Sequence, residues 1–224
     1  TGSSEALATM PDRWRSCLGG TGELDLRGVR LLSPHQYLWS TESLFSRLAG
    51  LFASQTLRSR VTRIAPTERP APFDHPGFQG DLYRLHEPVL DIPSLVARLT
   101  TLVGERLRRL PEGARVELQA GPAPGLRLSL TDGDELRLDA RLLIFVAGAG
   151  NAGLLESIGE RGIATQCRPL QMVMVRGRLP PVFAHCLGAG VNPRLTITSY
   201  PLPGGQQLWY LGGDLAETGV SKNA

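Results

Sequence analysis

Three glycines follow an apolar run near the middle of the sequence. Residues 142–147 read LLIFVA, and Gly148, Gly150 and Gly153 come next in the spacing G-x-G-x-x-G. This spacing is typical of a turn whose bare backbone approaches the phosphates of a bound dinucleotide. The continuously apolar run before it is typical of a strand buried on both faces. The pattern therefore raises the hypothesis that a buried strand ends in a nucleotide-binding turn.

The rest of a dinucleotide-binding unit is incomplete in this sequence. Such a unit also needs a long helix after the glycines and a second strand, with an acidic residue about 20 positions further on. Here the helical pattern ends at Gly159, and the next expected strand, residues 171–175, is followed by Arg176. An arginine there could receive the 2′-phosphate of NADP, which keeps an NADP-binding protein open as an alternative.

Helical and strand patterns are mixed along the chain. Apolar side chains recur at helical spacing over residues 41–52 and 91–110, and Asp91 stands where a helix cap is expected. Other segments read as strands joined by tight turns, an organisation that favours an α+β fold. One expected strand runs through Leu82 and Leu85 and ends at Pro88. The others include residues 114–118, 125–130 and 135–147, and two more flank the turn at residues 203–205.

The composition is that of an ordinary globular protein, with 224 residues, 42% hydrophobic and 20% charged. Its net charge of +3 comes from arginines spread along the chain, which argues against nucleic-acid binding.

The sequence has no apolar stretch of membrane-spanning length and no signal-peptide pattern at its start, so we expect a cytoplasmic protein. Its three cysteines lie far apart without zinc-site spacing, so we expect no metal site.

Four fragments of the sequence occur in a characteristic order. They are GDLYRLHEPVLDIPSLVARL, TDGDELRLDARLLIFVAGAGNAGLL, CRPLQMVMVRG and PLPGGQQLWYLGGDLAETG. Together they resemble the D-amino acid oxidase, glycine oxidase and sarcosine oxidase family of FAD-dependent oxidoreductases. The resemblance covers roughly residues 80–219 and rests on the order of elements and on these short fragments.

The resemblance implies an α+β fold with two kinds of domain. A mixed, largely antiparallel sheet with helices on one face binds the substrate, and a three-stranded β-meander belongs to a partial FAD-binding domain. The implied ranges are 1–110 and 166–224 for the substrate side and 111–165 for the FAD side. The family's own G-x-G-x-x-G motif lies near the N-terminus, and this chain shows no counterpart. We therefore expect an inactive fragment whose partner is the missing N-terminal FAD-binding segment.

The resemblance also implies a cofactor, FAD, in the full-length protein. On this interpretation the backbone of Ala147, Gly148, Ala149 and Gly150 forms a second glycine turn, where the small side chains let the backbone approach the cofactor. Val116, on the strand that lies against the adenine in the family, is a further candidate. Whether the fragment alone holds FAD stays open.

The substrate in this family is a small molecule held by a sheet above the flavin. Tyrosines contribute there, and an arginine binds a carboxylate through two hydrogen bonds. The candidates here are Tyr83, Arg84, Tyr200 and Tyr210. Each also has an ordinary interpretation as a half-buried sheet residue or a solvated charge. Because Trp209 and Tyr210 are adjacent on one strand, only one of the two can face a cavity.

The leading hypothesis is therefore the substrate-binding region of an FAD-dependent oxidoreductase. The whole protein would oxidise a small amine, amino acid or hydroxy acid by hydride transfer to the flavin. The catalytic residues stay unassigned, because the flavin performs that chemistry in the family. Glu87 is a candidate general base, although an exposed structural carboxylate is the simpler interpretation. The main alternative is a non-catalytic binding domain in which the glycines only permit tight packing.

Overall fold

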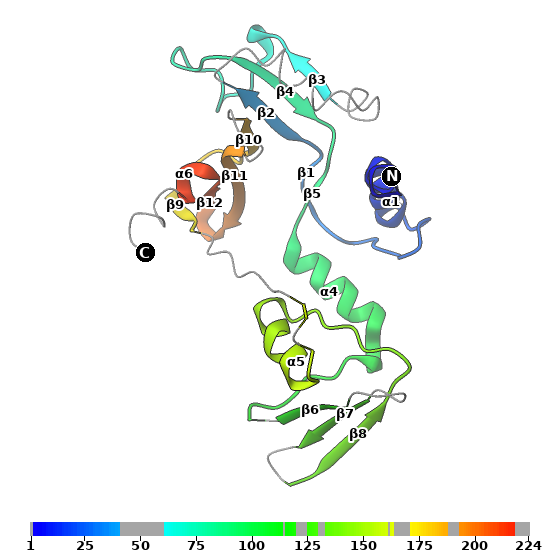
Figure 1. Ribbon diagram of the computed structural model, residues 1–224. Coiled ribbons are helices and arrows are strands. Elements are labelled where there is room, and N and C mark those ends of the chain that lie inside the picture. The colour runs from blue at the N-terminus through cyan, green and yellow to red at the C-terminus, as the bar shows by residue number, and fades with distance from the viewer. Residues whose placement is uncertain are drawn as a thin grey trace. The chain divides into compact units, whose positions relative to one another are not determined.

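The computed structural model describes residues 2–40, 61–113, 115–119, 125–129, 133–160, 162–163, 171–187 and 193–217 (Figure 1). The chain divides into two compact units, one formed by residues 1–103 with 170–224 and the other by residues 104–169. The predicted helix over residues 41–52 lies outside the described residues. In the described ranges, no helix is long and apolar enough to cross a membrane.

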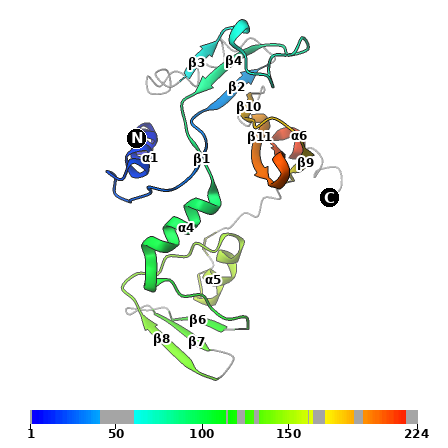
Figure 2. The ribbon, with the colours of Figure 1, turned by 180° about the vertical axis from the view of Figure 1, so that it is seen from behind.

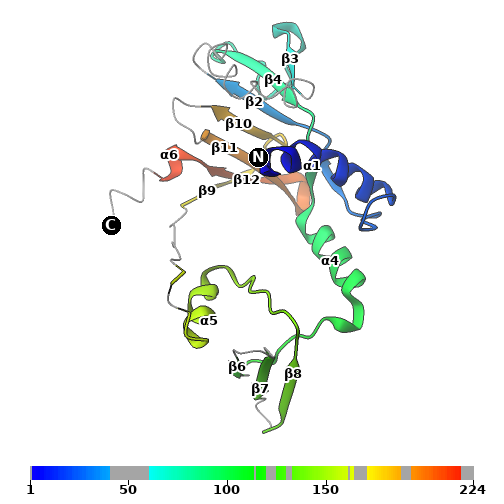
Figure 3. The ribbon, with the colours of Figure 1, turned by 45° about the vertical axis from the view of Figure 1, so that its right-hand side comes forward.

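The first unit is built on a mixed sheet that has seven strands in the described part of the chain (Figure 3). The strand order is β3-β4-β2-β10-β11-β12-β9. Strands β2 and β10 run parallel, and the other neighbours in this order run antiparallel. The strands are β2 (Gln36–Ser40), β3 (Val61–Ile64), β4 (Asp81–Leu85), β9 (Val173–Gly177), β10 (Phe183–Leu187), β11 (Pro193–Leu202) and β12 (Gln206–Gly212).

Short elements complete the first unit around this sheet. Strand β1 (Leu31–Ser33) pairs antiparallel with β5 (Val89–Leu90). Among the described residues of this unit, the helices are α1 (Gly2–Gly19), α4 (Ile92–Val103) and α6 (Asp214–Glu217), which follows β12.

One face of the sheet is closed by an aromatic core. The ring of Phe73, from the loop between β3 and β4, lies 5.2 Å from Tyr37, 5.6 Å from Trp39 and 5.4 Å from Phe78. Trp209 packs against the same core, and its Nε1 donates a hydrogen bond to the carbonyl of Pro180 (2.8 Å). The buried residues beneath these rings are Ile64, Leu82, Val182 and Ala184. Since side chains alternate along a strand, the opposite face carries a different set of residues.

The hairpin between β11 and β12 forms where the sequence predicts it. Residues 203–205 connect the strands, and Gly204 and Gly205 have φ angles of 73° and 71°. Glycine adopts this left-handed conformation without the steric cost that a side chain brings. The resulting register places Thr198 opposite Tyr210, so these two side chains share one face of the sheet.

Helix α4 starts where the sequence predicts and ends earlier. The backbone N–H of Ser94 donates to Asp91 Oδ2 (3.1 Å), which confirms Asp91 as the cap. The prediction that the helix continues to residue 110 is wrong, because the α-helix ends at Val103. Gly104 follows with a φ of 58°, and a glycine in this conformation terminates many helices.

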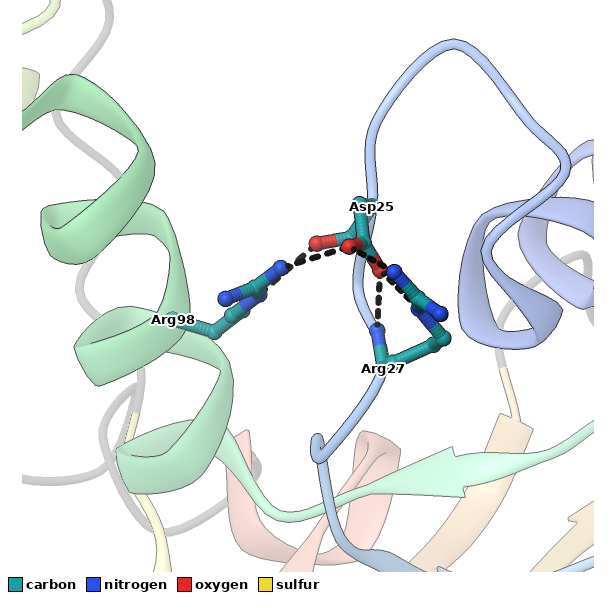
Figure 4. A network of polar contacts seen from close by, with 3 residues as sticks. All are labelled: Asp25, Arg27 and Arg98. Carbon is teal, nitrogen blue, oxygen red and sulfur yellow. Dashed lines mark hydrogen bonds and ion pairs between the residues drawn. The ribbon is translucent and has the colours of Figure 1, made fainter.

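Ion pairs fix the segment before β1 against α4 (Figure 4). The carboxylate of Asp25 contacts Arg27 (2.8 Å) and Arg98 (2.9 Å), and Arg98 Nε also donates to the backbone oxygen of Asp25 (2.7 Å). The hydrogen bonds from Arg27 hold the pKa of Asp25 well below its usual range. Arg30 pairs with Asp91 (2.9 Å) in the same way, and its hydrogen bond lowers the pKa of Asp91.

The described residues of the second unit include a β-meander and a short helix (Figure 2). Strands β6 (Arg115–Gln119), β7 (Gly125–Ser129) and β8 (Glu135–Asp139) form an antiparallel sheet in that order. Helix α5 (Asn151–Ser157) follows the glycine turn. The mixed sheet of the first unit and this meander confirm the predicted α+β class.

The apolar run over residues 142–147 is not a strand. Leu142, Ile144 and Val146 are 71%, 73% and 86% exposed, and no strand includes them. A strand needs a neighbouring backbone to complete its hydrogen bonds, and no described strand pairs with this run. The prediction of a buried strand is therefore wrong for the described chain, which provides no surface to cover these side chains.

Candidate functional site

The first unit contains a cavity of about 580 Å³ on the sheet face opposite the aromatic core. Gln36 and Thr198 line the cavity, and each alternates along its strand with a core residue, Tyr37 and Ile197 respectively. A volume of this size lies within the range of small-ligand sites. The cavity therefore has both the position and the size for a small molecule.

Most of the cavity wall is apolar. Helix α1 contributes Met10, Pro11 and Trp14, and the segment from β5 to α4 contributes Val89 and Leu95. Walls of this kind exclude water and bind hydrocarbon groups through burial of apolar surface. Polar groups of a ligand must then be met by a few specific side chains.

Those side chains are Gln36, Glu87, Thr198 and Tyr200. Among the described residues that line the cavity, Glu87 is the one that carries a charge. The ring of Tyr200 packs edge to face on Tyr210, with ring centres 5.0 Å apart. The lining therefore combines a carboxylate, an amide and two hydroxyl groups with otherwise apolar residues.

The amide of Gln36 is held from outside the cavity. His185 Nε2 lies 2.9 Å from Gln36 Oε1, across the parallel strands β2 and β10. Burial lowers the pKa of His185, and its Nδ1 is buried without a hydrogen-bond partner in the described residues. The imidazole is therefore neutral at pH 7, which leaves one N–H for the contact with Gln36.

Two of the four predicted substrate residues meet at the cavity. Tyr200 lines it, and Tyr210 packs against Tyr200. Tyr210 thus shares a face with Tyr200, and Trp209 packs in the core on the other face, as their alternation predicts.

The other two predicted substrate residues lie elsewhere. Tyr83 shares the cavity face, but β2 and β10 separate its strand from β11, which places it roughly 14 Å away at the usual strand spacing. Arg84 lies on the core face, opposite Tyr37 and Thr62. The structure therefore does not bring Arg84 together with the tyrosines.

The predicted cofactor residues are in the second unit. Residues 148–150 form a 3₁₀ turn, and Gly148 has a φ of 56°, which favours glycine. Asn151 fixes this turn, since its Oδ1 accepts from the N–H of Ala147 (2.8 Å) and its Nδ2 donates to the carbonyl of Phe145 (3.3 Å). A Cβ added at Gly148 would meet nothing within 4 Å. The backbone of this turn is exposed, as a close approach to a cofactor requires.

Val116 and Ala149 complete the predicted cofactor set. Val116 lies in β6, and its side chain is outside the described part of the structure. Ala149 is exposed within the 3₁₀ turn, where the first backbone N–H groups have no acceptor inside the turn itself. These groups are the ones that could donate to a cofactor oxygen.

Comparison with known proteins shows a close relative. The chain is 49% identical over 227 residues to the probable FAD-dependent oxidoreductase PA4991 of Pseudomonas aeruginosa. The chain is homologous to an FAD-dependent oxidoreductase. This similarity confirms the predicted resemblance to FAD-dependent oxidoreductases, and the chain spans about half (56%) of the length of this curated relative. No protein-family model matches the chain.

Two solved structures are similar to this chain. The crystal structure of the FAD-dependent oxidoreductase PA4991 matches 99% of this chain and 55% of that chain with a TM-score of 0.76 and 44% identity. A glycine oxidase from Geobacillus kaustophilus matches 92% of this chain and 53% of that chain with a TM-score of 0.55 and 18% identity. The likeness to the glycine oxidase shows a shared fold.

The structure argues against the NADP-binding alternative. That interpretation needs a strand, the glycine turn, a long helix and a second strand in one parallel sheet. In the described chain, residues 142–147 form no strand, and α5 has only seven residues. Arg176 lies on β9, which pairs antiparallel with β12, and its Nε donates to Gln206 (2.7 Å). The supporting elements of an NADP site are therefore missing from the described chain.

Sequence reasoning missed most of the cavity. Gln36, Thr198 and Trp14 carry no motif, and they come from three distant parts of the chain. Their alternation with apolar core residues indicates that they face away from the core, but it does not indicate which strands adjoin. Glu87 is a candidate general base from the sequence, and the structure places it in the cavity wall.

Proposed function

We propose that this chain is the substrate-binding region of an FAD-dependent oxidoreductase. The whole protein oxidises a small amine, amino acid or hydroxy acid by hydride transfer to the flavin. The observation that carries this proposal is the 580 Å³ cavity on the sheet face opposite the aromatic core, in a chain 49% identical to a protein named as a probable FAD-dependent oxidoreductase. The cavity receives the substrate, and FAD is the cofactor of the whole protein.

The cavity wall favours an amine among these substrates. Glu87 provides the carboxylate of a cavity wall that also includes apolar residues such as Trp14 and Leu95. In such surroundings a carboxylate forms a strong hydrogen bond with a protonated amine, because little water competes for it. The apolar wall then binds the hydrocarbon part of the substrate.

The tyrosine pair orients the substrate. Tyr200 is held by its edge-to-face contact with Tyr210, so its hydroxyl is presented from a fixed ring. Thr198 is the neighbour of Tyr210 across the hairpin and adds a second hydroxyl to the wall. These groups position the reacting carbon, and the flavin, when bound, supplies the hydride acceptor.

The exposed glycine turn fits a role in holding FAD. Gly148 and Ala149 expose their backbone in a turn that Asn151 fixes, and no neighbouring side chain would contact a Cβ at Gly148. We propose that the backbone of residues 147–150 approaches the cofactor in the whole protein. We also propose Val116 as a cofactor residue, and this proposal rests only on its position in β6.

The exposed apolar run before this turn supports a partner segment. Leu142, Ile144 and Val146 alternate along the sequence and are largely exposed. Exposed apolar rows of this kind mark surfaces that another segment covers. We propose that an N-terminal FAD-binding segment of the whole protein covers them and completes the cofactor site.

The test is purification of the full-length protein and its visible spectrum. We expect the yellow absorption of oxidised flavin. We then add small amines, amino acids and hydroxy acids in turn under anaerobic conditions, and we expect one of these three classes of compound to bleach the absorption. Bleaching reports reduction of the flavin directly, without a downstream electron acceptor. A full-length protein that stays colourless after reconstitution with FAD would contradict the proposal and favour a non-catalytic binding domain.

A further inference from the structure

The contact between Gln36 and His185 has a defined direction. Gln36 lines the cavity. His185 is not among the lining residues and contacts the Gln36 side chain, with His185 Nε2 at 2.9 Å from Gln36 Oε1. Because His185 is neutral, it carries one proton, on either Nε2 or Nδ1. Its Nδ1 is buried and has no hydrogen-bond partner in the described residues.

The surroundings decide where that proton resides. A proton on Nδ1 would be a buried donor without an acceptor, whereas a proton on Nε2 is accepted by Gln36 Oε1. The reversed orientation of the Gln36 amide would require Nε2 to be the acceptor and would force the proton onto Nδ1. The favoured arrangement is therefore Nε2–H donating to Oε1, which leaves the NH₂ group of Gln36 free.

The NH₂ group of Gln36 remains accessible. The nitrogen is not among the buried unpaired polar atoms of the described chain, and the one hydrogen bond of the Gln36 side chain is that of its oxygen. Gln36 also lies on the face that borders the cavity. The group that it presents to a bound molecule is thus a donor.

We propose that His185 is a positioning residue that turns the Gln36 amide so that its NH₂ group donates to a carboxylate or carbonyl oxygen of the molecule bound in the cavity. This inference rests on the proposed function only in taking the cavity as the ligand site. Gln36 then selects for an acceptor atom, since a ligand without one leaves a polar group unpaired. His185 itself does not touch the ligand.

The first test is the tautomer of His185, measured by ¹⁵N NMR in the full-length protein. We expect the Nε2–H form in the wild type and loss of this preference in Gln36→Leu, which removes the acceptor. His75 is the internal reference, because its Nδ1 accepts from the N–H of Gly77 (2.9 Å) away from the cavity. An Nδ1–H form in the wild type, or an unchanged tautomer in Gln36→Leu, would overturn the proposal.

The second test is the binding of acetate and methylammonium by calorimetry. We expect acetate affinity to fall roughly tenfold in Gln36→Leu and in His185→Leu, the size of one hydrogen bond. The isosteric variant Gln36→Glu should bind acetate more weakly still, because it replaces the amide with a carboxylate, the second in the cavity wall beside that of Glu87. Methylammonium, which has no acceptor oxygen, should bind these Leu variants at least as tightly as it binds the wild type.

The matched control is Gln206→Leu. Gln206 also accepts a hydrogen bond on the same sheet, from Arg176, but it does not line the cavity. Unchanged acetate affinity in His185→Leu, or loss of affinity in the control as large as in Gln36→Leu, would overturn the inference. Acetate binding that follows these expectations in a full-length protein that stays colourless after reconstitution with FAD would overturn the proposed function and support this inference.

Discussion

Tyr200 and Tyr210 pack edge to face across the β11–β12 hairpin, with ring centres 5.0 Å apart and ring planes at 70°. Tyr200 lines the cavity, and Tyr210 supports it from the neighbouring strand. The two tyrosines therefore have different roles. One ring supplies a hydroxyl to the ligand site, and the other ring holds it in place.

Substitutions at this pair should therefore differ in kind. In the full-length protein, Tyr200→Phe keeps the ring contact and removes the hydroxyl, so we expect KM to rise about fivefold to tenfold with an unchanged melting temperature. Tyr210→Leu removes the supporting ring and should lower the melting temperature as well. Steady-state kinetics and thermal unfolding measure the two effects. An unchanged KM in Tyr200→Phe would show that its hydroxyl does not contact the substrate.

Glu87 should govern the affinity for protonated amines. Glu87→Gln keeps the size of the side chain and removes its charge, so methylammonium affinity should fall by at least about tenfold, the range of a hydrogen bond to a charged group. Acetate affinity should not fall. Glu105→Gln is the matched control, because Glu105 lies outside the cavity. Equal methylammonium affinity in wild type and Glu87→Gln would remove the argument for an amine substrate.

Two glycines of the same segment should respond in opposite directions. Gly148 has a φ of 56°, so Gly148→Ala should cost about 1–2 kcal/mol and weaken FAD binding by the full-length protein. Gly153 lies inside α5 with open space around it, so Gly153→Ala should stabilise the helix by up to about 1 kcal/mol. Urea unfolding and FAD titration measure both. Equal effects at the two positions would contradict the conformation assigned to Gly148.

Asp25 and Asp91 should make stability depend on pH in the acid range. Their pKa values are lowered in the folded protein, chiefly by hydrogen bonds from Arg27 and Arg30. Their contribution is therefore present above the ordinary carboxyl pKa of about 4 and is lost as pH falls through the lowered values. We expect the melting temperature to drop below about pH 4, and to depend less on pH in Asp25→Asn.

The control for this acid effect is Glu23→Gln. Glu23 pairs with Arg13 at 2.6 Å, but both side chains are at least half exposed, so its loss should change little. If Asp25→Asn kept the pH dependence of the wild type, the ion pairs with Arg27 and Arg98 would not stabilise the docking of the segment before β1.

Several features of this protein follow from local sequence. Asp91 caps α4 because a carboxylate at that position can accept the N–H of Ser94, and the β11–β12 turn forms because its two glycines tolerate positive φ. Strand alternation alone separates Trp209 from Tyr210. These outcomes depend on residues within a few positions of each other, so the sequence alone determined them, together with the α+β class.

The tertiary structure decided which of these side chains share a site. Tyr83 and Arg84 differ in position by one residue and face opposite sides of the sheet, and only the strand order shows that neither adjoins Tyr200. Gln36 and His185 are 149 positions apart and meet because β2 and β10 pair in parallel. The apolar composition of residues 142–147 indicated a buried strand, but burial requires a partner surface that the described chain does not provide. Local composition fixes what a segment can form, whereas contacts between distant segments decide what it faces.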